Sequence, residues 1–293
     1  MLKKENLSSK LFDIFNYTLM ICLIIITLYP CYYVVVASVS NPVEVYASKG
    51  MLFYPKGFSL STYMEVLEND AIWIGYKNTI IYVAVGGALS VFLTLTAAYS
   101  LTRKEVPGQN LIIMMIVFTM YFSGGMIPTY LVVKTLGILD TRWAMILPSA
   151  IATYNLIITM SYFRGIPYEL EEAAKVDGAN AYKILWKIML PLAKPIIAVI
   201  ALYYMVSIWN SFYDALLYLY DQTLYPLQLT LRDILIQGNT DLMGGVDSAD
   251  NAFMYEENLK YAVIVVSTIP IMCVYPFIQK YFVKGVMIGA VKG

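Results

Sequence analysis

The sequence predicts an all-α integral membrane protein with six membrane-spanning helices and both termini in the cytoplasm. Of its 293 residues, 59% are hydrophobic and only 14% are charged, whereas a soluble domain usually carries about a quarter charged residues. The apolar residues gather in long runs, and a helix needs about 20 of them to cross a bilayer core. Basic residues concentrate in alternate connections between these runs, which sets the direction of each crossing.

One transmembrane domain, 1–293, is expected to contain all of these helices. We place the spans at about residues 14–39, 75–101, 111–135, 142–163, 192–219 and 259–283. The first apolar run is too long for the apolar region of a signal peptide, so it is interpreted as a retained span. In the second span, Gly86 and Gly87 allow close approach of a neighbouring helix. In the third span, Gly124-Gly125 and Pro128 predict a break in the helix.

Lysine and arginine placement predicts which connections face the cytoplasm. The N-terminus, the loop 102–109, the segment 164–191 and the C-terminal tail hold most of the basic residues. By the positive-inside rule these segments lie in the cytoplasm. The segment 220–258 is acidic and is expected to form an external loop, with a short helix at about 226–236.

The residue content argues against several classes of protein. There are no histidines, so the commonest general base and metal ligand is absent, and we expect neither a catalytic nor a metal site. The formal net charge is zero, which is not the footprint of a nucleic-acid-binding protein. The spans carry almost no ionisable groups, since Asp13 and Asp214 lie near predicted span ends. Transport energised by a separate subunit therefore fits better than an ion-coupled carrier.

The segment 164–191 predicts a short polar helix, a turn and a second helix at the membrane surface. Pro167 suits the first turn of a helix, and the acidic residues from Glu169 to Glu172 favour its N-terminal end. Gly178 can adopt the left-handed conformation that ends a helix, and Asn180 can cap the next one. A structured surface segment of this kind indicates contact with another protein.

Aromatic residues are the candidates for a substrate path. Most of the 26 tyrosines, 12 phenylalanines and 4 tryptophans are expected at the lipid interface or in lipid-facing packing. Flat rings beside amide or carboxylate groups can instead stack on sugar C–H faces and bond hydroxyl groups. The candidates of this second kind are Tyr121, Phe122, Trp209, Asn210, Phe212, Tyr213 and Asp214.

The motif Glu172-Ala173-Ala174, followed by Asp177-Gly178 and then by Leu190-Pro191, resembles the EAA loop of permease subunits of ATP-binding-cassette importers. The longer segment 162–179 is similar to the carbohydrate-uptake branch, typified by the second permease of the maltose importer. Residues 121–130 and the Val-Lys-Gly ending look most like the LplC- and YtcP-type permeases of that branch. The resemblance covers essentially the whole chain.

The resemblance implies the type I importer permease fold in a bacterial cell membrane, in contact with membrane lipid. It implies four kinds of partner: a second homologous permease, two ATPase subunits, an extracellular solute-binding lipoprotein and a carbohydrate substrate. ATP and Mg would bind to the ATPase subunits and no cofactor to this chain. The ATPase-coupling residues would be Glu171, Glu172, Ala173, Ala174, Asp177, Gly178 and Ala179. The tail residues at the ATPase interface would be Gly289, Val291, Lys292 and Gly293.

Two alternatives remain open at this point. The same kind of importer could carry a peptide, an amino acid or an anion, although an anion path would be expected to contain arginine or lysine. A membrane scaffold or sensor that docks an ATPase without transporting anything would share the surface segment. Stimulated ATP hydrolysis by the assembled complex would distinguish transport from docking alone.

Overall fold

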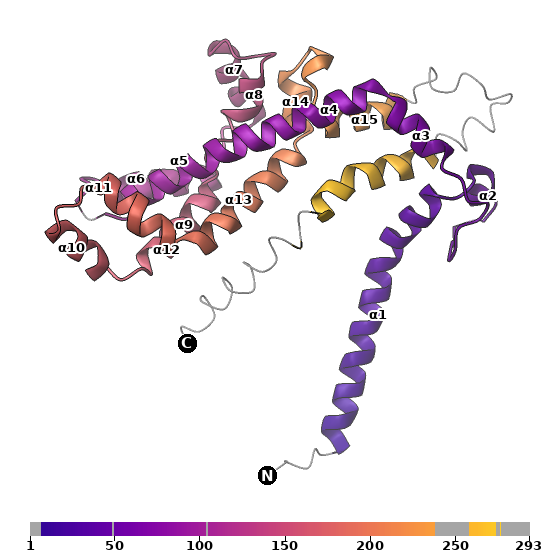
Figure 1. Ribbon diagram of the computed structural model, residues 1–293, viewed down its shortest axis with the longest axis horizontal. Helices are drawn as coiled ribbons and strands as arrows, with labels where there is room; N and C mark the ends of the chain where they lie inside the picture. The colour runs from indigo at the N-terminus through magenta and orange to yellow at the C-terminus, as the bar shows by residue number, and fades with distance from the viewer. Residues whose placement is uncertain (1–6, 49, 104, 238–257, 274–275, 277–293) are drawn as a thin grey trace. The chain divides into compact units, whose positions relative to one another are not determined.

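Figure 1 shows the computed structural model, which describes residues 7–48, 50–103, 105–237, 258–273 and 276. Within these ranges every regular element is helical and none is a β-strand, which confirms the all-α prediction for the described part of the chain. The predicted tail residues Gly289, Val291, Lys292 and Gly293 lie outside the described residues, as do the end of the last predicted span and most of the predicted external loop. The chain divides into two compact units, Met1–Asn69 with Ile234–Ile269, and Asp70–Asp233 with Pro270–Gly293.

The first unit is built on helix α1, Leu7–Ser38, which runs without interruption through Pro30. Its leucine, isoleucine and aromatic side chains are largely exposed, as expected for a helix whose solvent is lipid. The two short helices α2 (Pro42–Ala47) and α3 (Ser61–Glu68) follow it.

The first unit has a small core at the C-terminal end of α1. Val36, Ala37, Val45 and Leu52 are buried there together. The amide of Asn258 donates to the carbonyl oxygen of Ser40 at 3.1 Å, which ties the start of helix Asn258–Cys273 to the same place. A buried amide with this partner fixes the register of that helix.

The second unit is organised around one 31-residue helix, Asp70–Ser100, which combines α4 (Asp70–Ile81), the π-helical turn η1 (Tyr82–Gly86) and α5 (Gly87–Ser100). Small buried residues recur along it at steps of four on either side of the π-helical turn. They are Gly75 and Thr79, and then Gly86, Ser90, Thr94 and Ala98. Residues four apart lie on one face of a helix, so each set of small residues shares one buried face. The close approach predicted at Gly86 is present, because a Cβ there would lie 3.3 Å from the side chain of Ile208.

Helices α9 (Thr153–Arg164) and α13 (Lys194–Trp209) pack with α5 in the largest buried core of the described chain. Leu156 and Ile200 are almost fully buried in this core. The hydroxyl of Tyr204 lies 2.7 Å from Thr94 Oγ1 and accepts the N–H of Ala152 at 3.0 Å. One side chain of α13 therefore holds both α5 and the irregular segment before α9.

Several apolar segments are broken helices. Helix α6 (Gln109–Tyr121) and helix α7 (Met126–Thr135) meet at 117°, with Gly125 at a φ of 88°, so the predicted Gly-Gly break is confirmed. Helix α8 (Arg142–Ile146) is separated from α9, and α13 is followed by the short helix α14 (Tyr213–Tyr218). Two helices of the described chain are long and apolar enough to cross a membrane, or up to four if each bent pair is one span.

Polar side chains of α4 and η1 hold the segment 223–227. Asn78 Nδ2 donates to the carbonyl oxygens of Thr223 and Tyr225 at 2.7 and 3.1 Å. The hydroxyl of Thr79 accepts the N–H of Leu227 at 2.8 Å. These bonds satisfy backbone groups that burial removes from water. They place helix α15, Leu227–Gln237, at the position where the sequence predicted a short helix.

We predict that Gly75→Ala lowers the midpoint of thermal denaturation of the purified protein in detergent, whereas Gly87→Ala leaves it unchanged or raises it. A Cβ at Gly75 would lie 3.0 Å from the backbone Cα of Leu227, which cannot move without α15. A Cβ at Gly87 meets Met205 Cγ at an ordinary 3.8 Å and gains up to about 1 kcal/mol of helix propensity. Equal midpoints for the two variants would contradict the packing described above.

Candidate functional site

The candidate site is the helix α10, Glu169–Val176, in the segment 164–191. Three of its first four residues are glutamates, which the N-terminal end of a helix favours. The helix ends in a Schellman motif, in which the N–H of Gly178 donates to Lys175 O at 3.0 Å and the N–H of Ala179 donates to Ala174 O at 2.9 Å. Gly178 has a φ of 75°, as predicted for a helix-ending glycine.

The second helix of this segment starts where it was predicted to start. Asn180 Oδ1 accepts the N–H of Lys183 at 2.9 Å and so caps helix α11, Ala181–Ile184. The π-helical turn η2 (Leu185–Met189) and helix α12 (Leu190–Leu192) continue it. This composite helix meets α13 at 84°, so the segment changes direction sharply before the chain enters α13.

Helix α10 has one inward face and one outward face. Glu171 and Ala174 are the buried residues of this helix. Glu172 and Ala173 are exposed, and Val176 is 88% exposed. The predicted coupling residues therefore differ in exposure. Glu171 and Ala174 are buried against the rest of this chain, and Ala179 is half-buried. The exposed residues are Glu172, Ala173, Asp177 and Gly178.

The inward face of α10 is held by an ion pair. The guanidinium group of Arg103, three residues beyond the end of α5, donates through Nη1 to Glu171 Oε2. The same guanidinium group lies over the ring of Tyr99, 4.3 Å from its centroid. Only 3% of the Glu171 side chain and 13% of the Arg103 side chain are exposed. Removing one partner of a buried ion pair typically costs about 3–5 kcal/mol, because the other charge is left unpaired.

A second ion pair lies at the surface beside the first. Lys175 Nζ is 2.8 Å from Glu105 Oε1, and both side chains are substantially exposed. The hydrogen bond from Lys175 holds the pKa of Glu105 below its usual value, and the same bond raises the pKa of Lys175. Both groups are therefore charged at neutral pH. The pair is lost when acid protonates Glu105 or when alkali deprotonates Lys175. Exposed pairs of this kind contribute little to stability.

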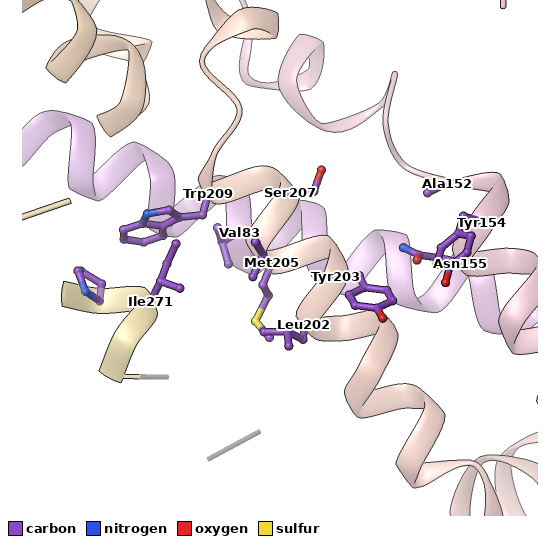
Figure 2. A pocket seen from close by; sticks show the side chains of 12 residues that line it. Val83, Ala152, Tyr154, Asn155, Leu202, Tyr203, Met205, Ser207, Trp209 and Ile271 are labelled. Carbon is purple, nitrogen blue, oxygen red and sulfur yellow. The ribbon is translucent and has the colours of Figure 1, made fainter. Parts of the chain in front are cut away.

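A cavity of about 770 Å³ lies beside the C-terminal half of α13, between residues 202 and 209 (Figure 2). Trp209, one of the predicted substrate-path residues, lines this cavity. The polar groups there come from Tyr154, Asn155, Tyr203 and Ser207. The remaining lining is apolar: Val83, Ala152, Leu202, Met205, Val206, Pro270 and Ile271. Aromatic rings with a few neutral hydrogen-bonding groups form the kind of surface that small-molecule pockets use.

The other predicted path residues do not line this cavity. Asn210 donates its side-chain amide to Val206 O at 2.9 Å, so this amide folds back on its own helix. The Tyr213 hydroxyl lies 2.7 Å from Met126 Sδ, which joins α14 to the start of α7. Tyr121 is 75% exposed, and the ring of Phe122 stacks on Phe118 with centroids 4.4 Å apart. Phe212 packs edge-on against the ring of Tyr213, and Asp214 lies in the first turn of α14.

Sequence reasoning missed Arg103 and Tyr99 as the contacts that hold the inward face of α10. Nor did it find the exposed ion pair of Glu105 with Lys175 beside them, which lies outside the buried contact. It also missed Tyr154, Asn155, Tyr203 and Ser207 as lining of the cavity. An arginine directly after an apolar span is an ordinary topology signal, and nothing in its neighbourhood indicates a partner that lies 68 positions away. The Tyr154-Asn155 pair within the predicted span 142–163 was the available signal for the cavity.

Comparison with known proteins places the chain in a family. Residues 71–288 match the family described as binding-protein-dependent transport system inner membrane component. Protein LplC of Bacillus subtilis (strain 168) is 44% identical, over 98% of this chain and 96% of LplC. The polygalacturonan/rhamnogalacturonan transport system permease protein YtcP of the same organism is 43% identical, over 98% of this chain and 100% of YtcP.

A solved structure extends the likeness to three dimensions. It is a chain of a bacterial ABC transporter involved in the import of the acidic polysaccharide alginate. Its TM-score with this chain is 0.86 at 34% sequence identity, and the match covers 96% of this chain and 99% of that one. The fold is therefore that of an ABC importer permease. The chain is a multi-pass membrane protein and belongs to the family of binding-protein-dependent transport system inner membrane components.

Proposed function

We propose that this chain is the permease subunit of an ATP-driven importer and that it translocates a sugar or oligosaccharide across the cell membrane. The observation that carries the proposal is α10, a short surface helix with an exposed Glu172-Ala173 face, fixed by its other face to the membrane helices. The small side chain of Ala173 allows close approach of a partner. The similarity to the polygalacturonan/rhamnogalacturonan permease YtcP and to the alginate importer supports a carbohydrate cargo.

The partners in this proposal are a second homologous permease, two ATPase subunits and an extracellular solute-binding lipoprotein. ATP and Mg bind to the ATPase subunits, and this chain itself catalyses no reaction and holds no cofactor. Closure of the ATPase pair displaces α10, and the attached spans then move between inward-facing and outward-facing arrangements. The tail residues from Gly289 to Gly293 contact the ATPase interface.

The proposed topology has six spans in one permease domain, with both termini in the cytoplasm. The two long helices, the two bent pairs and the broken pair α8–α9 supply apolar segments for five crossings. The apolar helix Asn258–Cys273 begins the sixth. With this topology the segments that hold most of the basic residues lie on the cytoplasmic side, as the positive-inside rule requires. The segment 164–191, which contains α10, is one of them.

The cargo path includes the cavity beside α13. Its surface is almost entirely apolar, it includes the rings of Trp209, Tyr154 and Tyr203, and its lining contains no charged side chain. Such rings suit the C–H faces of sugars. The similar solved structure belongs to an importer of the acidic polysaccharide alginate. The carboxylates of an acidic sugar would need cationic groups from outside this lining. The similarity to carbohydrate importers favours an oligosaccharide over a peptide. The absence of a charged side chain from the lining argues against an inorganic anion.

The first test is uptake by the complete complex in proteoliposomes, with the binding protein outside and ATP inside. We expect binding-protein-dependent ATP hydrolysis and import of one class among radiolabelled oligogalacturonides, alginate oligosaccharides and maltooligosaccharides. A stable complex whose ATP hydrolysis responds to none of them would favour the docking scaffold. Import of a labelled peptide instead would contradict the carbohydrate assignment.

Reversing the charge on the outward face of α10 should abolish import. Glu172→Lys removes an exposed carboxylate at the proposed ATPase contact, without touching a buried contact of this chain. We expect loss of ATPase co-purification or of uptake, with normal membrane insertion. The control is Glu68→Lys, which reverses another exposed carboxylate in α3, outside the proposed contact. Equal uptake in both variants would refute the role of Glu172.

The turn after α10 offers a conformational test. Gly178→Val places a β-branched residue at a φ of 75°, which costs about 1–2 kcal/mol or more, whereas Gly178→Asn is compatible with that conformation. A Cβ at this position meets nothing within 4 Å in the chain, so any loss arises from the backbone or from the partner surface. We expect uptake to fall in the valine variant and to be largely retained in the asparagine variant. Similar losses in both would indicate that a partner contact, and not the turn, requires glycine.

The cavity offers a test of the path. Trp209→Ala should lower the uptake rate at saturating binding protein several-fold, and Trp209→Phe should retain most of it, because a flat ring remains. Phe92→Ala is the matched control, since it removes an exposed aromatic ring of α5 that lies outside the cavity. An unchanged uptake rate in Trp209→Ala would show that the substrate does not pass along this part of the cavity.

A further inference from the structure

We infer that Arg103 and Glu171 are positioning residues for energy coupling. Their buried ion pair is the joint through which displacement of α10 is transmitted to the long helix Asp70–Ser100. This inference rests on the proposed function and adds to it a route for the motion. The chain connections at the two ends of α10 lead to α9 and α13, whereas the ion pair leads to a third span.

The length and surroundings of α10 make a side-chain attachment necessary. The helix has 8 residues, and an isolated helix of that length is not stable in water. A turn lies at each end, at Gly165 and at Gly178. Glu171 and Ala174 are the residues of α10 buried against the rest of the chain. If these contacts were lost, a force on the outward face would be absorbed by rotation in the two turns.

The ion pair has the geometry of a fixed joint. Glu171 Oε2 accepts from Arg103, and the Tyr99 hydroxyl lies 3.5 Å from Glu171 Oε1. Two other nitrogens of the guanidinium group, Nε and Nη2, are buried and have no acceptor within the part of the chain that the structure describes. Glu171 is the carboxylate that forms an ion pair with Arg103, and the Tyr99 ring lies against the guanidinium charge from one side.

The position of Arg103 sets where a displacement enters the membrane region. Arg103 follows Ser100, the last residue of α5, by three positions, and Tyr99 is itself part of α5. Helix α5 is packed against α9 and α13 in one core through Leu95, Ala98 and Tyr99. Motion of α10 thus reaches the centre of the three-helix core, in addition to the ends of α9 and α13.

The exposed pair Lys175–Glu105 supplies a control. Lys175 Nζ also lies 3.5 Å from Glu171 Oε1, so Glu105→Gln removes the Lys175–Glu105 contact alone and leaves both ion pairs of Glu171 in place. The Lys175–Glu105 pair also joins α10 to the segment after α5, at 2.8 Å, but its side chains are 41% and 59% exposed. Water and salt screen such a pair, so it cannot hold α10 against a load. Loss of the Glu105 charge should therefore leave coupling intact, although it removes an ion pair between the same two segments.

The test measures solute imported per ATP hydrolysed by the complete complex in proteoliposomes. For Glu171→Gln and Arg103→Gln we expect ATP hydrolysis to persist while this ratio falls about fivefold or more, a typical size for a coupling effect. For Glu105→Gln we expect the wild-type ratio. An unchanged ratio in both buried-pair variants, or an equal fall in Glu105→Gln, would overturn the inference. A wild-type complex that imports none of the carbohydrates would instead refute the proposed function, and this inference with it.

A reversible bridge separates positioning from folding. In a background without Cys22, Cys31 and Cys273, the double variant Arg103→Cys with Glu171→Cys is joined by a short bifunctional thiosulfonate reagent. We expect the bridge to restore the import-to-hydrolysis ratio and a reducing agent to abolish it again. A general folding defect would not respond to a link at this one place. No recovery on bridging, in a complex that still hydrolyses ATP, would overturn the role of the joint.

Discussion

The second unit depends on the close packing that small residues allow along the helix Asp70–Ser100. Gly86, Ser90, Thr94 and Ala98 form one buried face, and α9 and α13 lie against it. In a membrane, where lipid is as apolar as the helices, such close contact is a main source of helix association. The same helix also carries the polar groups that hold the segment before α15, and it leads into the loop that holds α10.

Polar contacts complete this packing at both ends of the helix. Toward its start, Asn78 and Thr79 satisfy backbone groups of the segment 223–227. Beyond its end, Arg103 pairs with Glu171 of α10. One long helix is thereby attached to a segment proposed to lie outside the cell and to a helix proposed to contact the ATPase. In an importer, this continuity gives a physical route between the two sides of the membrane.

Much of the fold and part of the site could be predicted because their causes are local in sequence. The glycine at the end of α10, the cap at Asn180 and the break at Gly125 follow from short-range backbone rules, and the structure places each where it was predicted. The partners of buried charges could not be predicted in this way. Arg103 and Glu171 are brought together only by the packing of α5 with its neighbours, and neither residue type specifies the other.

The substrate path shows the same division. The pattern of an aromatic ring beside an amide found Trp209, which lines the cavity, but it also selected Asn210, whose amide bonds its own helix. Helical periodicity does not separate the two, because α13 ends at Trp209 and Asn210 is the residue that follows its last turn. Tyr154 and Asn155 join the wall because α9 begins only after the break at 147–152, and the break is set by tertiary contacts such as that of Tyr204 with Ala152.

The most direct test of the account is the distance between α10 and α5 in different nucleotide states. Spin labels at Val176, on the exposed face of α10, and at Phe92, on the exposed face of α5, would report it in the complete complex by pulsed electron paramagnetic resonance. If the ion pair moves α10 and the long helix together, the distance distribution is the same without nucleotide and with ATP trapped, and it broadens in Glu171→Gln. A distance that changes between the two states in the wild-type complex would contradict the account.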